Sequence, residues 1–341
     1  MKELSKLRKI ENLLLQATIF VVTYIFIYKQ VFQKTNLPQL LKTVDEEFLK
    51  PGSRYLIAAI LLLMVINWSL EAVKWQYLIG KVEKVGFFKS LRAVLTGISI
   101  SSFTPNRVGE FFGRVFFLDK ASHIEGILIT IVGSLSQLMI TIIAGSLALL
   151  VFIPVHMPGT IYSHGYLYMG IVAIVATMDL LLLALFFNLS FLTTLKQQIL
   201  KNGLKKLRRF FRVFAFYHNR ELFRVMLLSL TRYLVFSTQF YLLLRLFNVN
   251  ISYPNGIMLI ALTYFIMAII PTIALTELGI RGSVALYFFG LYFGQNSMAG
   301  TQVNLGIFAA STILWMINLG LPALIGTVFV FRLKFFRRND E

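Results

Sequence analysis

The residues in this chain that could do chemistry are charged side chains set in sequence apolar enough to lie in lipid. Segment 101–114 reads Ser-Ser-Phe-Thr-Pro-Asn-Arg-Val-Gly-Glu-Phe-Phe-Gly-Arg and places Arg107, Glu110 and Arg114 within eight residues. A charge at the centre of a bilayer costs about 2.5–3.5 kcal/mol on insertion scales. Three such charges beside a proline and two glycines indicate a protein-lined or water-filled interior rather than a plain spanning helix.

A second segment, 271–282, has the same ingredients and reads Pro-Thr-Ile-Ala-Leu-Thr-Glu-Leu-Gly-Ile-Arg-Gly. Glu110 and Arg114 are four residues apart, as are Glu277 and Arg281, with the glutamate first in each pair, the favourable order on a helix. One interpretation is a salt bridge that keeps each segment neutral. The other is that the arginines bind a lipid phosphate, while the glutamates keep the empty site paired or carry protons.

Residues that interrupt helices accompany both sets of charges. A proline lacks the backbone N–H and disfavours helix at the residue before it. Glycines four residues apart, as in Gly109-x-x-x-Gly113 and Gly290-x-x-x-Gly294, are also typical of close helix contacts in membranes. We predict structural hinges at Pro105, Gly109, Gly113, Pro271, Gly279 and Gly282.

Two more charged groups could belong to the same site. Arg232 lies near the middle of an apolar run and requires a carboxylate or a phosphate that its own helix does not supply. Glu71 can pair with Lys74 three residues on. The pattern fits an interfacial anchor, with Trp68, Trp75 and Tyr77 as belt aromatics, as well as it fits a functional group. The predicted substrate-binding residues are Arg107, Glu110, Arg114, Arg232, Glu277, Arg281, Asn106 and Glu71.

The elements that must position these residues are membrane helices. The chain has 341 residues, of which 57% are hydrophobic, and a mean hydropathy of +0.75. Only 14% are charged, against about 25% in soluble domains. Repeated apolar runs of about 20 residues predict an all-α, polytopic membrane protein and exclude a soluble or secreted one. Without cysteine, disulfides and thiolate chemistry are excluded, and we expect no metal and no cofactor.

Charge distribution sets the predicted topology. The net charge is +18, with cations concentrated between apolar runs, which favours contact with anionic headgroups over nucleic acid. Basic N- and C-terminal tails place both termini in the cytoplasm.

Asp179, inside a predicted span, is either a proton site or, as we favour, a packing carboxyl. The predicted spans are 12–32, 55–79, 125–152, 166–188, 222–247 and 305–331.

We predict a single transmembrane domain, 1–341, with three parts. The first half, 1–188, contains the motif region 93–118, whose arms 93–103 and 106–118 are each too short to cross a bilayer. The basic stretch 189–221 is predicted to be an amphipathic helix on the inner leaflet. The second half, 222–341, contains the motif region 257–294.

Opposite flanking charges orient the two motif regions. Basic loops flank the first, so it enters as a re-entrant hairpin from the cytoplasm, whereas the uncharged loops 248–256 and 295–304 place the second on the other side. Two broken hairpins entering from opposite faces predict an inverted-repeat carrier with its site near the midplane. Because 257–270 is long, region 257–294 could instead be two full spans, which leaves the exterior position of its flanking loops unchanged.

The two motifs also carry a family resemblance. In Thr104-Pro-Asn-Arg-Val-Gly-Glu110 with Arg114, and in Thr276-Glu-Leu-Gly-Ile-Arg-Gly282, the chain resembles the lysylphosphatidylglycerol synthase transmembrane-region family, the flippase half of bacterial multiple peptide resistance factors and their stand-alone relatives. The resemblance implies a multi-helix bundle with two re-entrant elements that moves or presents lipid across the cytoplasmic membrane. Because the chain ends at Glu341 without the fused aminoacyl-transferase domain, we expect a stand-alone member that is not an enzyme.

The leading functional hypothesis is a flippase-like lipid translocase in the cytoplasmic membrane. Its expected partner is an anionic phospholipid or a polyprenyl-phosphate-linked lipid, and a homodimer is compatible with the sequence. No G-x-x-x-x-G-K-[ST] loop is present, so a gradient or mass action would drive transport. The alternatives are a membrane-embedded enzyme acting on a lipid-linked substrate and a scaffold that uses its basic helix to recruit lipid or protein.

Overall fold

Long helices dominate the molecule. The computed structural model describes residues 21, 50, 52–102, 104, 107–156, 165–188, 216–270, 274–294 and 300–330, and all regular secondary structure among them is helical. Five segments are long and apolar enough to cross a membrane. They are α3 (Ser53–Ile79), α6 (His123–His156), α8 (Gly165–Phe187), α11 (Asn219–Leu246) and the continuous C-terminal rod formed by α14 (Gly300–Trp315), the π-helical turn η4 (Met316–Gly320) and α15 (Leu321–Val330).

These helices confirm the prediction of an all-α, polytopic membrane protein. Helix α8 shows the lipid-facing pattern clearly, because large apolar side chains such as Ile174 and Leu180 are exposed along it. Exposed apolar surface of this kind is stable only against lipid or another protein. The predicted first span, 12–32, and the basic segment 189–215 lie outside the described residues, apart from Val21.

The first motif region forms two short helices, α4 (Phe87–Ser101) and α5 (Gly109–Val115). Their contacts run antiparallel, because Gly113 approaches Gly97 while Gly109 approaches Ile100. The prediction of an arm beginning at residue 93 was wrong by six residues, since Gly86 is extended and the helix starts directly after it. At about 22 Å, α4 is still shorter than a bilayer core.

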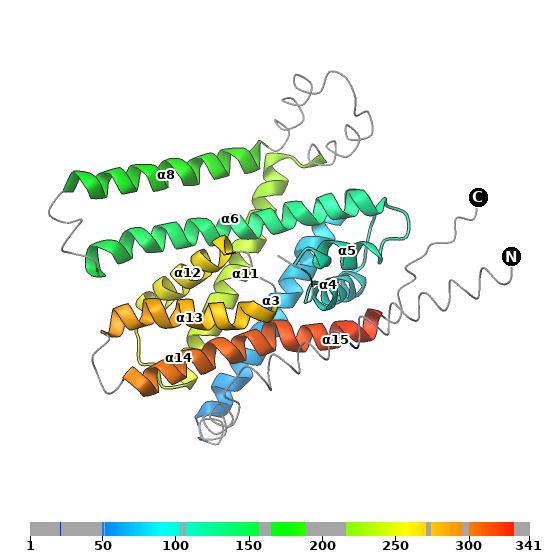
Figure 1. Cartoon of the computed structure of the whole chain (residues 1–341). Helices are drawn as coiled ribbons and strands as arrows, with labels where there is room; N and C mark the ends of the chain where they lie inside the picture. The colour runs from blue at the N-terminus through cyan, green and yellow to red at the C-terminus, as the bar shows by residue number, and fades with distance from the viewer. Residues whose placement is uncertain are drawn as a thin grey trace.

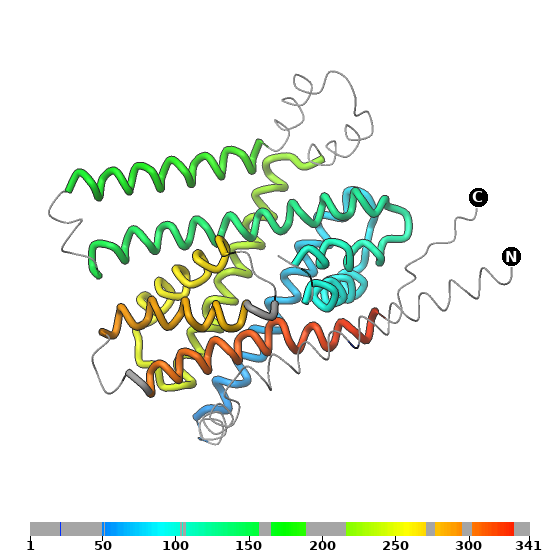
Figure 2. Tube along the Cα trace, viewed as in Figure 1, coloured from blue at the N-terminus to red at the C-terminus, as the bar shows by residue number. Residues whose placement is uncertain are grey.

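The second motif region forms α12 (Tyr253–Ile269) and α13 (Ala274–Phe293). Helix α12 begins before the predicted residue 257 because an extended Ser252 and a proline in the first turn start it earlier. In Figures 1 and 2 the chain passes from α11 through α12 to α13 and then to α14, with α13 lying between α12 and α14.

The two helix pairs contact opposite halves of α6. Near the start of α6, Gly126 lies against Val115, the last residue of α5, and against Leu118, which follows α5. In the other half of α6, Gly145 lies against Phe265 of α12. Figure 1 shows the same arrangement, with α5 beside one end of α6 and α12 beneath its other half. The re-entrant and inverted-repeat arrangement stays a prediction.

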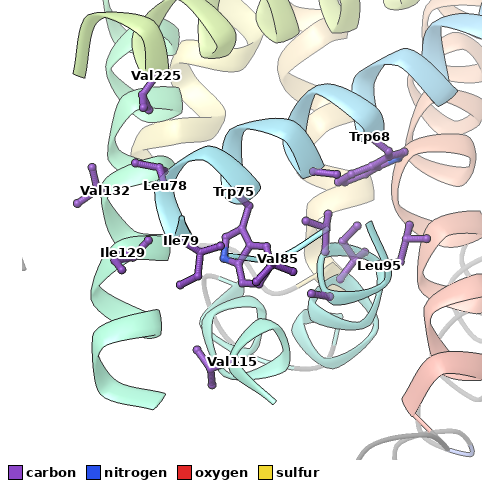
Figure 3. Packing of buried hydrophobic residues seen from close by; sticks show 14 of the residues in the cluster. Trp68, Trp75, Leu78, Ile79, Val85, Leu95, Val115, Ile129, Val132 and Val225 are labelled. Atoms are coloured by element: carbon purple, nitrogen blue, oxygen red, sulfur yellow. The ribbon is translucent and has the colours of Figure 1, made fainter. Parts of the chain in front are cut away.

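Two buried clusters of apolar side chains hold these elements together. The first is built mainly from α3, α4, α5 and the first half of α6, with side chains of α11 and α15, and the second mainly from α11, α12, α13, α14 and the second half of α6. In Figure 3 Trp75 of α3 points into the first cluster toward Val85. Trp75 is 1% exposed and its indole N–H donates to Thr130 Oγ1 at 3.1 Å. The interpretation of Trp68 and Trp75 as interfacial belt residues was therefore wrong, since both are buried.

Candidate functional site

Glu71 is the centre of a buried ion cluster. Its carboxylate lies 2.9 Å from Lys74 Nζ one turn along α3, 2.9 Å from Arg114 of α5 and 3.1 Å from Arg232 of α11. Glu71, Lys74 and Arg114 are 4%, 1% and 2% exposed. Sequestered charges of this kind are tolerated only when they are paired. The cluster therefore ties the first motif to two spanning helices.

Glu110 extends this cluster on α5. It pairs with Arg114 one turn away, and Arg114 donates from Nη2 to both Glu110 and Glu71. Glycine makes this geometry possible, because a Cβ on Gly113 would lie 2.6 Å from the Gly97 Cα. A Cβ on Gly97 would lie 3.1 Å from the Arg114 side chain. The close approach of α4 and α5 thus leaves Arg114 room between the two carboxylates.

A second ion cluster connects the two motifs directly. Arg107 Nη2 donates to both oxygens of Glu277 at 2.7 Å, although the two residues are 170 positions apart in sequence. Arg281 pairs with the same carboxylate from the next turn of α13. The Glu277 side chain is 5% exposed, whereas that of Arg107 is 40% exposed. Arg107 is thus the member of the pair that solvent or a headgroup can reach.

Arg107 also has an unusual backbone. Its φ is +56°, in the left-handed region that non-glycine residues rarely occupy. Such a conformation costs about 1–2 kcal/mol and persists only where the surroundings enforce it. The residue lies in the connection between α4 and α5, and its side chain crosses to the N-terminal turn of α13. The strain and the ion pair lie at the same residue.

A chain of buried amides holds Arg232 from the other side. Arg232 Nε donates to Asn67 Oδ1 at 3.0 Å, Asn67 donates to Asn318 Oδ1 at 3.0 Å, and Asn318 donates to Gln239 Oε1 at 2.8 Å. Gln239 ends the chain by donating to the Ile60 carbonyl at 2.9 Å. Asn318 lies in the π-helical turn η4, a type of irregularity found frequently at functional sites. The chain connects α14–α15 to the Glu71 cluster through α3 and α11.

These amides were not predicted from the sequence as site residues. Asn67, Gln239 and Asn318 are isolated polar residues in long apolar helices, and that isolation is the signal that could have found them. Lys74 was considered only as a partner of Glu71, and it also lies 3.4 Å from Ser229 Oγ of α11. The structure places all four side chains in or next to the predicted site.

The predicted charged residues come together in the two clusters. Both four-residue Glu–Arg pairs form as expected, and the carboxylate that Arg232 requires is supplied by Glu71 of α3. Arg232 also lies over the Trp68 ring, 5.3 Å from its centroid. Asn106, together with Pro105 and Pro271, lies outside the described residues. The substrate-binding role of the set stays a prediction.

The predicted hinge glycines have different surroundings. A Cβ on Gly109 would lie 2.6 Å from the Ile100 carbonyl oxygen, and one on Gly282 would lie 2.9 Å from the Phe308 ring. With Gly113, they are points of close helix contact. A Cβ on Gly279 or Gly290 would meet no atom within 4 Å among the described residues, so a close contact at Gly290 is not observed. Hinge motion at these positions stays a prediction.

Asp179 lies apart from both clusters. It is buried on α8 and accepts a hydrogen bond from Ser146 Oγ of α6 at 2.7 Å. This contact is the packing arrangement that the sequence favoured for Asp179. The group therefore joins α8 to α6 rather than the two charged motifs.

The connection between α3 and α4 holds the base of the α4–α5 pair. Glu83 accepts hydrogen bonds from the backbone N–H groups of Asp119, Lys120 and Ala121 at 3.1, 2.7 and 3.0 Å. Burial alone would raise the pKa of Glu83, but these three N–H groups and Lys89 together lower it to about 2. Glu83 is thus an ionised carboxylate that joins the loop before α4 to the loop after α5.

The chain matches the model of a known protein family over most of its length. The family model for the lysylphosphatidylglycerol synthase TM region matches residues 13–317, which include every residue of both ion clusters. This family is the membrane part, associated with flippase-like lipid handling, and not the synthase domain. A comparison with curated proteins gives no match. With five candidate spanning helices and a match over most of its length, the chain belongs to the lysylphosphatidylglycerol synthase transmembrane-region family and is a multi-pass membrane protein that contacts membrane lipids.

Proposed function

We propose that the protein is a translocase that moves a phospholipid or a polyprenyl-phosphate-linked lipid across the cytoplasmic membrane, with both termini in the cytoplasm. The observation that carries the proposal is the ion pair between Arg107 and Glu277, which joins the two charged motifs across 170 residues of sequence. In this proposal the headgroup phosphate binds to the arginines of both motifs.

The carboxylates supply the resting partners of these arginines. Arginine binds carboxylate and phosphate through the same planar fork of N–H donors, so a phosphate can take the place of a glutamate without a new binding geometry. Glu277 holds Arg107 and Arg281 while the site is empty, and Glu71 and Glu110 hold Arg114. The arginines are therefore never left as unpaired charges in a low-dielectric interior.

Exchange of one acceptor for the other would begin at Arg107. Its side chain is the accessible one in the second cluster, and its pairing with Glu277 is the direct ion pair between the α4–α5 connection and α13. A phosphate that replaces Glu277 at Arg107 breaks that connection. Binding of the headgroup is thereby coupled to separation of the two motifs, which is the type of change that alternating access requires.

Transport by purified protein in vesicles tests the proposal. The full chain is reconstituted with fluorescent phospholipids, and the lipid that reaches the other leaflet is measured by chemical quenching. Arg107→Gln should slow transport about 10- to 100-fold, because hydrogen bonds to charged groups contribute about 1.5–3 kcal/mol. Arg245→Gln, at an exposed arginine of α11, is the matched control and should transport like the wild type.

Two results would contradict the proposal. One is that folded wild-type protein, monodisperse in detergent and helical by circular dichroism, moves none of the phospholipids or polyprenyl phosphates offered. The other is that Arg107→Gln transports as fast as the wild type. The second result would be compatible with transport, but it would show that Arg107 does not bind the headgroup during transport.

A further inference from the structure

Resting on the translocase proposal, we propose that the headgroup bound here is a dianionic phosphate, a phosphomonoester or a diphosphate, and that Tyr264 is one of the residues that bind it. The assignment follows from the charge of the ion clusters and from buried donors that have no partner among the described residues. It predicts that phosphodiester lipids bind more weakly and that lipids with a cationic headgroup do not bind.

The ion clusters carry an excess of positive charge. Arg107 of the second cluster lies three residues before Glu110 of the first, at the start of α5, so the two clusters meet on one short segment and form one charged region. The region contains three carboxylates and five cations, a net charge of +2 by subtraction. The carboxylates are Glu71, Glu110 and Glu277, and the cations are Lys74, Arg107, Arg114, Arg232 and Arg281.

Such an excess selects among headgroups. Charge that is buried without compensation is costly, and a ligand is favoured in proportion to the charge that it neutralises. A phosphomonoester carries about −1.5 to −2 at pH 7 and balances the excess. A phosphodiester, with a single negative charge, leaves part of it uncompensated. A headgroup that also bears amines adds to it.

Unpartnered donors point to the same class of ligand. Among the described residues, the hydrogen bonds that Arg107, Arg114 and Arg281 make to carboxylates run through one nitrogen of each arginine, Nη2. The Nε atoms of Arg114 and Arg281 are buried and have no hydrogen-bond partner in the described part of the chain. Such a donor destabilises the empty site while it is unsatisfied. Three terminal phosphate oxygens accept more of these bonds than the two of a diester.

Tyr264 of α12 adds an uncharged donor on the helix that packs against α13, the helix of Arg281. Its ring is 6% exposed and stacks on Phe236, with centroids 4.8 Å apart. Its hydroxyl is buried without a hydrogen-bond partner within the described ranges, and its helix α12 packs against α13, the helix that carries Arg281. A buried phenol usually has a partner. A phosphate on Arg281 would supply it.

Binding by the full chain in detergent tests the assignment, with ligand affinity read from the shift of the thermal unfolding midpoint. The probes share acyl chains and differ in headgroup: phosphatidic acid, phosphatidylglycerol and lysylphosphatidylglycerol, with inorganic phosphate and pyrophosphate as soluble arms. Phosphatidic acid should bind about tenfold or more tightly than phosphatidylglycerol, a difference of about 1.4 kcal/mol, and lysylphosphatidylglycerol should not bind. Binding of the soluble ions at similar affinity would identify free phosphate or diphosphate, rather than lipid, as the source of the dianion.

A pH series and two variants sharpen the test. Since the second pKa of a phosphomonoester is about 6, the advantage of phosphatidic acid should shrink as the pH falls below 6. Arg281→Gln lowers the net charge of the region to +1 and should narrow the same preference. Tyr264→Phe should weaken phosphatidic acid binding about three- to tenfold, whereas Tyr287→Phe, at an exposed tyrosine of α13, should not.

The outcomes separate this inference from the translocase proposal. Equal or tighter binding of phosphatidylglycerol, binding of the lysyl lipid, or no binding of any probe would overturn the inference. A preference for phosphatidic acid in a protein that moves no lipid would support the charge assignment and contradict transport alone. Transport of lipid without a preference for the dianionic headgroup would support the translocase proposal and contradict the charge assignment.

Discussion

Glu71→Gln is the substitution that tests most directly whether the buried ion cluster is held together as described. The wild-type carboxylate faces Lys74, Arg114 and Arg232 within 3.1 Å. Glutamine has the same size and still accepts a hydrogen bond, but it carries no charge. The variant therefore isolates the electrostatic contribution and leaves the packing of α3 nearly unchanged.

The expected loss of stability in Glu71→Gln depends on which partners each neighbouring cation keeps. Arg114 keeps Glu110, and Arg232 keeps Asn67 and Gln137 as hydrogen-bond acceptors. Lys74, in contrast, is left with Ser229 at 3.4 Å and is 1% exposed. Breaking a buried pair by removing one partner costs about 3–5 kcal/mol. We expect a loss of that size, and most of it is assigned to Lys74.

A second substitution checks that assignment. In the Glu71→Gln background, Lys74→Met removes the unmatched cation and should recover about 1–3 kcal/mol relative to additive behaviour. The measurement is the free energy of unfolding in mixed detergent micelles for the wild type, both single variants and the double variant. Glu125→Gln in the first turn of α6 is the matched control and should change stability by less than about 0.5 kcal/mol. If the two substitutions are additive, Lys74 is not the stranded charge and the reasoning fails.

Two further predictions concern the α4–α5 pair. Glu83→Gln should lower the free energy of unfolding by about 1.5–3 kcal/mol at pH 7. The pKa of Glu83 in the folded protein is lowered to about 2 from an ordinary 4.5, so the stability difference between wild type and variant should be full above pH 4.5 and vanish as the pH falls toward 2. Unfolding measurements across that pH range test this prediction. Gly113→Ala places a methyl 2.6 Å from the Gly97 Cα and should cost about 1–3 kcal/mol and slow lipid transport, whereas Gly170→Ala, which meets nothing within 4 Å, should leave both unchanged.

The sequence predicted features that depend on local order. Continuous apolar runs predicted the spanning helices α3, α6, α8 and α11 to within a few residues, because the length of such a run is set by the bilayer. The pairs Glu110–Arg114 and Glu277–Arg281 were predictable for a similar reason, since residues four apart on a helix are neighbours in any fold.

Contacts between distant segments could not be predicted in the same way. The sequence identified Arg232 as a charge in need of a partner, but only the crossing of α3 and α11 shows that the partner is Glu71. The error at Trp75 has the same origin. A tryptophan near the end of a span fits a membrane interface, and its burial depends on α4 and α6 packing around it.

The two ion clusters differ in a way that bears on mechanism. In the first, Glu71, Lys74 and Arg114 are all buried, and their bonds fix α5 to α3 and α11. In the second, Arg107 is exposed by 40% and its backbone is strained, although it makes the bond between the two motifs. Breaking the Arg107–Glu277 pair leaves Glu277 paired with Arg281 and frees a side chain that is already partly exposed, whereas breaking the first cluster strands buried cations. Within the proposed translocase, the first cluster is therefore the fixed base of the α4–α5 pair, and the Arg107–Glu277 contact is the connection that opens when a phosphate binds.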